Sequence, residues 1–168
     1  MIIKLKGKYI FVFTALIAVG ISAVVIKNSV PVFSDNKPYT IVLDAGHGEP
    51  DGGAVGIGGT IEKDINLKVT LKLQEILESR GVRVVLTRPD DNSICDESAK
   101  TLHEKKVSDM RNRLDIINNS NADLAISIHM NSFPNPKSGG LHVFYARNHP
   151  EAEYLASSVQ DEISALTN

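Results

Sequence analysis

The sequence predicts an α/β domain with an open, mostly parallel, twisted sheet and helices on both faces, arranged in three layers. Short apolar runs of strand length alternate along the chain with longer segments in which apolar residues recur at helical spacing. The first short run is apolar at nearly every position, as expected for a strand buried on both faces of a parallel sheet. The expected order is β-α-β-α-β-β-α, and such alternation places helices on both sides of a parallel sheet.

The first half of the domain contains the first two strands and the helix between them. Residues 40–45 are the buried strand, and residues 46–59 hold seven glycines and one proline, which predicts a loop. Apolar residues at helical spacing predict a helix over residues 64–80, and Gly81 is the expected stop at its C-terminus. Residues 82–87 are the second expected strand, so this half is predicted to be one β-α-β unit.

The second half continues the alternation and adds a strand without an intervening helix. Residues 89–100 are polar and irregular, and the apolar spacing after them predicts a helix that ends near residues 118–119. Residues 122–128 and 141–146 are the third and fourth expected strands. Pro150 marks the start of a last helix, because proline is favoured at the first helical position.

The N-terminal segment is expected to lie outside the folded domain. Three lysines precede an uncharged run over residues 9–26, which is just long enough to cross a bilayer. The basic leader keeps the start of the chain in the cytoplasm and directs the rest outward. Residues 1–27 are therefore expected to be a membrane anchor, or a cleaved signal that would leave the protein secreted; either way the protein is extracytoplasmic. Residues 28–38 resemble a linker, and residues 39–168 form the domain.

Composition excludes several classes of function. The formal net charge is −2, so the chain lacks the basic surface that would follow a nucleic acid backbone. Cys95 is the one cysteine, so neither an intramolecular disulfide nor a cysteine-based zinc site can form. We interpret Cys95 as incidental, because no neighbouring basic residue lowers its pKa.

Two histidines stand at the ends of two predicted strands. His47 follows the first strand between Gly46 and Gly48, and His129 follows the third. In open parallel sheets, ligands bind outside the carboxyl ends of the strands. Two imidazoles and one carboxylate, with a fourth position open for water, make up one known type of catalytic zinc site. Glu62 is the carboxylate that we expect to complete the set.

Each of these residues has a second interpretation when taken alone. A histidine at a strand end is more often packed or hydrogen-bonded than a ligand, and a glutamate just before a helix commonly offsets the helix dipole. Glu49 and Asp51 are alternative carboxylate ligands, ranked below Glu62 because they stand in a turn rich in glycine and proline. Asp44 either orients an imidazole as an outer partner or caps the loop, and both interpretations stay open.

Five short motifs occur in order along the domain and together are similar to one family. They are LDAGHG at residues 43–48, DGGA at 51–54, EKD at 62–64, TR at 87–88 and SIHMN at 127–131. The set resembles the zinc-dependent N-acetylmuramoyl-L-alanine amidases of bacterial cell walls and covers the chain from Tyr39 onward. Residues 144–162 resemble more narrowly the membrane-anchored sporulation amidases that prepare spore-cortex peptidoglycan for muramic-lactam formation.

The resemblance implies an activity and a set of site residues. The expected reaction is hydrolysis of the amide that joins N-acetylmuramic acid to the L-alanine of the stem peptide, so the expected partner is peptidoglycan. The zinc ligands implied by the motifs are His47, Glu62 and His129. Asn131, two positions past His129, is expected to face the substrate, whereas Arg88 and Arg113 are expected to hold structure. The resemblance leaves the need for an accessory protein open.

The chain departs from the family pattern at one position. The family carries its general-base glutamate in a later strand, and no residue of this sequence matches it. We therefore expect residues 39–168 to be a catalytic domain that is incomplete at its C-terminus, with that glutamate beyond Asn168. A positioned base is often worth about 10²–10⁴-fold in rate. The alternative function is therefore a truncated, non-catalytic protein that binds peptidoglycan or a partner.

Overall fold

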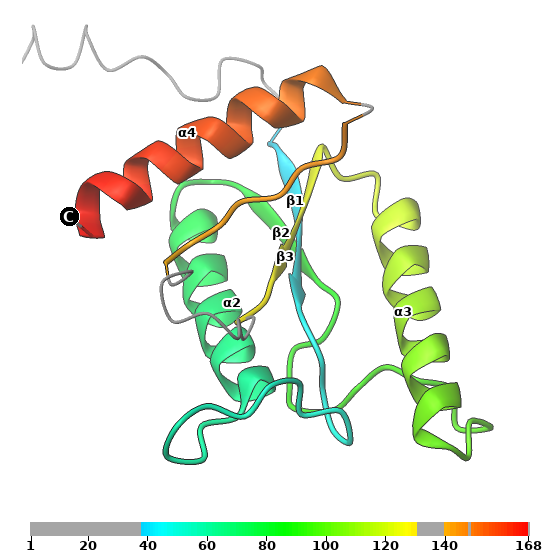
Figure 1. The fold of residues 1–168 in the computed structure, drawn as a ribbon. Helices are drawn as coiled ribbons and strands as arrows, with labels where there is room; N and C mark the ends of the chain where they lie inside the picture. The colour runs from blue at the N-terminus through cyan, green and yellow to red at the C-terminus, as the bar shows by residue number, and fades with distance from the viewer. Residues whose placement is uncertain (1–37, 131–139, 148, 168) are drawn as a thin grey trace, which may run out of the picture.

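The computed structural model describes residues 38–130, 140–147 and 149–167. Within these residues the order of elements is β1 (Thr40–Ala45), α2 (Glu62–Ser79), β2 (Arg83–Leu86), α3 (Leu102–Asn119), β3 (Leu124–Ile128) and α4 (Pro150–Thr167). The strands form one parallel sheet in the order β2-β1-β3. The sheet stands between α2 and α3 (Figure 1), which confirms the predicted open α/β arrangement with helices on both faces.

Strand β1 is the centre of the sheet. It pairs with β2 on one side and β3 on the other, and its residues Val42, Leu43 and Ala45 are fully buried. This agrees with the continuous apolar run in the sequence, because a central parallel strand faces covered layers on both sides. In register, Ala45 lies opposite Ile128, so β1 and β3 end together at one edge of the sheet.

Helix α3 begins just after the polar residues 89–100, as the sequence predicts. Its first residue is Leu102, and a capping box starts it: the Thr101 hydroxyl accepts from the Glu104 backbone N–H, and the Glu104 carboxylate accepts from the Thr101 N–H. Both bonds satisfy backbone donors that a helix start leaves unpaired. Helix α2 ends as expected, because Gly81 follows it with a φ of 80°, in the left-handed region that glycine tolerates.

The prediction of a fourth strand over residues 141–146 is wrong. The described backbone there forms no ladder with another strand. Instead, the Val143 N–H donates to the side-chain oxygen of Gln160 on α4, and the Gln160 amide donates to the Leu141 carbonyl. The apolar run therefore belongs to an extended segment tied to α4, whose backbone polar groups are satisfied by a side chain rather than by a neighbouring strand.

The most deeply buried residues of α2 and α3 are polar. Asn66 and Thr70 on α2 are 0% exposed, and Asp109 and Arg113 on α3 are also buried. By contrast, Met110 on α3 is 65% exposed. The apolar spacing therefore located the helices, whereas the buried faces next to the sheet edge are largely polar.

A buried polar network joins the sheet to α3. The Asp44 carboxylate on β1 accepts hydrogen bonds from the Thr87 hydroxyl, the Ser127 hydroxyl on β3 and the Arg113 guanidinium on α3, each at 2.6 Å. Arg113 also donates to the Asp109 carboxylate at 2.6 Å. Because the members come from different elements, the network fixes α3 against the edge where β1 and β3 end.

The network holds Asp44 in its ionised form. Burial raises the pKa of the Asp44 carboxyl. The hydrogen bonds from Ser127 and Thr87 and the charge of Arg113 lower the pKa by more than burial raises it, so it lies below its usual value. Because the pKa is lower in the folded state than in the unfolded state, the ionised carboxylate stabilises the fold fully at pH values above the unfolded-state pKa. This stabilisation is lost as the pH falls through the folded-state pKa.

We expect Asp44→Asn to lower the free energy of unfolding at neutral pH by about 3 kcal/mol, because it leaves the buried Arg113 with less compensating charge. The difference from wild type should shrink as the pH falls below about 4, the ordinary aspartate pKa, because the unfolded wild-type chain then takes up a proton that the folded carboxylate resists. Urea denaturation from pH 7 to pH 3 measures both effects, with Asp115→Asn at an exposed position of α3 as the control. A difference that stayed constant over this range would contradict the role of the ionised carboxylate.

Candidate metal centre

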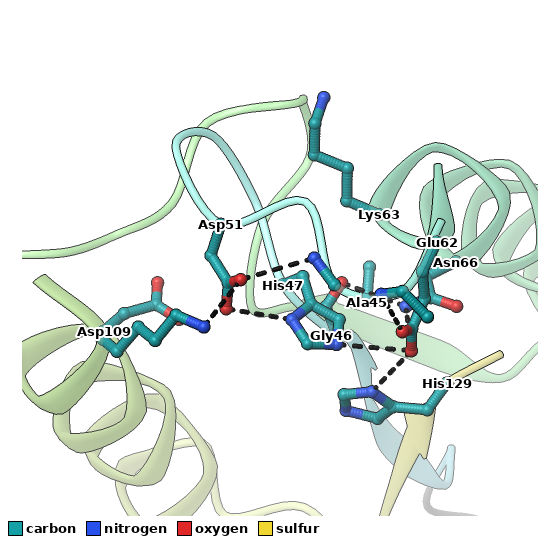
Figure 2. Close-up of polar contacts among 12 residues, drawn as sticks. Ala45, Gly46, His47, Asp51, Glu62, Lys63, Asn66, Asp109 and His129 are labelled. Atoms are coloured by element: carbon teal, nitrogen blue, oxygen red, sulfur yellow. Dashed lines mark hydrogen bonds and ion pairs between the residues drawn. The ribbon is translucent and has the colours of Figure 1, made fainter. Parts of the chain in front are cut away.

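Three side chains from three elements converge at the carboxyl edge of the sheet. His47 comes from the loop after β1, Glu62 is the first residue of α2, and His129 directly follows β3. One ligand atom of each lies within 4.8 Å of the other two. Figure 2 shows the Glu62 carboxylate between the two imidazoles, 3.2 Å from His47 Nε2 and 3.1 Å from His129 Nδ1.

The geometry of this set fits a small divalent ion. A tetrahedral zinc ion with bonds of about 2.1 Å separates its ligand atoms by about 3.4 Å. The separations from the Glu62 oxygen, 3.2 Å to His47 and 3.1 Å to His129, are close to that value, and the ligand nitrogens of the two histidines lie within 4.8 Å of each other. Two imidazole nitrogens and a carboxylate oxygen are also donors that zinc accepts. The residues present therefore fit the metal that the motifs imply.

Glu62 is held in place from two directions. Its Oε2 accepts the Ala54 backbone N–H at 2.8 Å, and its Oε1 accepts the Met130 N–H at 3.0 Å. Burial raises the pKa of the Glu62 carboxyl, but the N–H of Ala54, the hydrogen bond from His129 and the charge of His47 lower it more, so its pKa lies below the ordinary value. Glu62 thus starts a helix and also supplies an ionised oxygen at the site.

His47 is oriented by Asp51. The His47 Nδ1 lies 2.9 Å from an Asp51 carboxylate oxygen, which leaves Nε2 directed toward Glu62. The other Asp51 oxygen contacts Lys106 Nζ at 2.9 Å and the Gly53 N–H at 3.3 Å. Burial raises the pKa of Asp51, but its contacts with His47, Lys106 and Gly53 lower it to about 2. Asp51 is therefore an ionised partner of the ring, a role that the sequence alone did not assign to it.

Asp44 does not contact an imidazole in the described structure, although orienting one was among the roles predicted for it. Its carboxylate bonds Thr87, Ser127 and Arg113 instead. The reason is the register of the sheet: Asp44 lies opposite Ser127, and its side chain meets Arg113 on α3. Asp44 acts on the site indirectly, because Arg113 also donates to the His47 carbonyl.

Two other residues singled out in the sequence, Glu49 and Arg88, make contacts away from the two imidazoles. The Glu49 carboxylate is 3.7 Å from Lys63 Nζ rather than beside the histidines. Arg88 is fully buried and donates to the carbonyls of Ala45, Gly46 and Lys63, which suits the structural role expected for it.

Two further predictions fall outside the described residues. Asn131 lies there, as do the N-terminal segment over residues 1–27 and nearly all of the linker. In the part of the chain that the structure describes, every helix is too short or too polar to cross a membrane.

Two glycines leave room for the ligand side chains. A Cβ on Gly46 would lie 2.3 Å from Cε1 of the His129 ring. A Cβ on Gly53, whose φ is 71°, would lie 2.7 Å from both the Glu62 carboxylate and the His47 ring. Any side chain at either position would therefore displace a candidate ligand.

The site opens into a groove of about 340 Å³ between the sheet edge and α3. Both imidazoles lie along it, and its far wall on α3 includes Met110, Leu114 and Ile117. This groove could not be predicted from the sequence, because it depends on how α3 lies against the sheet.

Comparisons with known proteins agree on one family. Residues 41–168 match the family model described as N-acetylmuramoyl-L-alanine amidase. Over 141 residues the chain is 42% identical to the germination-specific N-acetylmuramoyl-L-alanine amidase of Bacillus subtilis (strain 168), a match that covers 78% of this chain and 59% of that protein.

Two solved structures share the fold. The CwlD amidase from Clostridioides difficile, solved in complex with the GerS lipoprotein, matches with a TM-score of 0.72 and 44% identity over 76% of this chain and 66% of that one. The amidase AmiC2 of Nostoc punctiforme matches with a TM-score of 0.57 and 34% identity over 72% of this chain and 58% of that one. The chain thus spans less than two thirds of the length of each of these relatives.

We expect Gly46→Ala to weaken zinc binding at least about tenfold while the protein stays folded. The half-exposed His129 ring can rotate away from the new methyl group, so the fold survives, but the ring then leaves its ligand position. Gly56→Ala is the matched control in the same loop, since its Cβ would meet nothing nearer than 3.6 Å. Competition with a chromophoric chelator measures the zinc affinity, and circular dichroism reports the fold. Equal affinities for the two variants would show that His129 is not a ligand.

Proposed function

The chain belongs to the N-acetylmuramoyl-L-alanine amidase family, and we propose that it uses Zn²⁺ to hydrolyse the amide between N-acetylmuramic acid and L-alanine in peptidoglycan. The convergence of His47, Glu62 and His129 at one point carries this proposal. The similarity to a germination-specific relative supports spore-cortex peptidoglycan as the substrate, in the maturation step that leads to the muramic lactam.

The donor set suits the proposed chemistry. When bound, zinc polarises an amide carbonyl and lowers the pKa of a bound water toward about 7. Two neutral imidazoles and one carboxylate leave a divalent ion with net positive charge, which favours an approaching carbonyl oxygen. Asp51 keeps Nε2 of His47 turned toward that point, and the backbone N–H groups of Ala54 and Met130 hold the Glu62 carboxylate.

The place of action follows from the substrate and from the N-terminal segment. Peptidoglycan lies outside the cytoplasmic membrane, and we propose that residues 1–27 anchor the domain at its outer face. The CwlD amidase was solved in complex with a lipoprotein. An accessory lipoprotein is therefore a natural partner for this chain, because both molecules would be tethered to the same surface.

We expect the purified full-length protein to bind one zinc ion and to release stem peptides from cortex-type peptidoglycan, with cleavage measured by mass spectrometry of the products. His129→Ala should reduce both zinc content and cleavage, the latter by at least about 100-fold, because it removes a ligand. His103→Ala, at an exposed position on α3, is the control and should leave both unchanged. Cleavage that survives His129→Ala would rule out this site, and zinc-loaded protein that binds muropeptides without cleaving them would favour the binding alternative.

Zinc is also expected to stabilise the fold, independently of any turnover. A ligand that binds only the folded state adds about 2.7 kcal/mol when present at 100 times its dissociation constant. Thermal unfolding with zinc and with a chelator should therefore give a clearly higher midpoint in zinc, and Glu62→Gln should remove most of the difference. The same zinc-dependent shift in Glu62→Gln as in wild type would place the metal elsewhere.

A further inference from the structure

We propose that Lys106 on α3 and Asp51 in the loop after β1 act together as positioning residues for His47. This inference rests on the proposed zinc site and extends it beyond the residues that touch the metal. The three side chains form a chain of contacts from the surface of α3 to the imidazole, and Figure 2 shows the contact between Asp51 and His47. Through this chain, α3 sets which nitrogen of His47 faces the other ligands.

The two oxygens of Asp51 have separate contacts. One lies 2.9 Å from His47 Nδ1, and the other lies 2.9 Å from Lys106 Nζ and 3.3 Å from the Gly53 N–H. The Asp51 side chain is 22% exposed and that of Lys106 is 47% exposed, so their ion pair is partly open to solvent. Contacts at both oxygens restrain the rotation of the carboxylate away from the ring.

This arrangement determines the orientation of the imidazole. A carboxylate accepts hydrogen bonds only, so Asp51 draws the Nδ1–H edge of the ring toward itself and directs Nε2 to the side where the other candidate ligands lie. Nε2 is the atom that lies 3.2 Å from Glu62. Removing such a carboxylate partner from a metal-binding histidine typically weakens metal affinity 10–100-fold.

Helix α3 also contacts the backbone of His47. Arg113, two turns after Lys106, donates to the His47 carbonyl and to the Ala45 carbonyl. His47 has a φ of 63°, which non-glycine residues rarely adopt, and such backbone persists where surrounding contacts determine it. The backbone contact from Arg113 and the side-chain contact through Asp51 therefore fix both parts of His47 from one helix.

Lys105 provides a matched control for Lys106. It is the neighbouring residue on α3 and carries the same charge, yet among the described residues its ammonium lies within ion-pair distance of no carboxylate. An effect of Lys106→Gln that Lys105→Gln does not reproduce must come from the contact with Asp51 and not from the net charge of the helix.

The test is a double-mutant cycle on zinc affinity. We expect Asp51→Ala to weaken zinc binding by about 10–100-fold. Lys106→Gln should weaken it only about threefold, because partly exposed ion pairs contribute little, and Lys105→Gln should leave it unchanged. The double variant Asp51→Ala/Lys106→Gln should bind zinc as Asp51→Ala does, because Lys106 acts through Asp51. Fully additive losses, or equal losses for the two lysine variants, would overturn the proposal.

A second measurement separates this inference from the proposed function. Crystal structures of the zinc-free wild type and of Asp51→Ala report which edge of the His47 ring faces Glu62. We expect Nε2 to face Glu62 in wild type and the ring to be rotated, or to take two orientations, in Asp51→Ala, with an unchanged unfolding midpoint as the control for folding. If wild type bound no zinc, the proposed function would fail while this readout still decided the inference. A His47 ring that keeps the same orientation in both proteins would overturn it.

Discussion

The contact of one Glu62 oxygen with both imidazoles is the interaction on which the proposed chemistry depends. It requires three separate elements to deliver their side chains to one point: β1 and β3 end together at the sheet edge, and α2 begins there. The parallel register therefore does more than build the core. It brings His47 and His129 to the same edge, and the start of α2 places a carboxylate between them.

Polar groups rather than apolar packing hold this edge together. The buried pair of Asp44 and Arg113 ties β1 to α3, and Arg88 bonds the carbonyls at the end of β1. Helix α3 in turn reaches His47 through Arg113 and, by way of Lys106, through Asp51. Such networks specify one arrangement when every member is satisfied, which suits an edge where ligand atoms must be placed within tenths of an ångström.

Much of the fold and the three candidate ligands could be predicted from the sequence, because strand ends in a parallel sheet share one edge. The fourth strand could not, since the groups that bond residues 141–146 belong to Gln160 on a later helix. The choice of Asp51 over Asp44 as the partner of His47 likewise depends on loop conformation and on the position of α3. Asp51 stood in the sequence as a candidate ligand, but nothing there indicated its contact with Lys106.

X-ray absorption spectroscopy of the zinc-loaded chain tests the central claim most directly, because it reports the metal's own ligands. The proposed site predicts nitrogen and oxygen neighbours at about 2.0–2.2 Å, with the outer scattering of two imidazole rings. A spectrum showing no imidazole scattering, or that of a single ring, would contradict the convergence of His47, Glu62 and His129 on one ion.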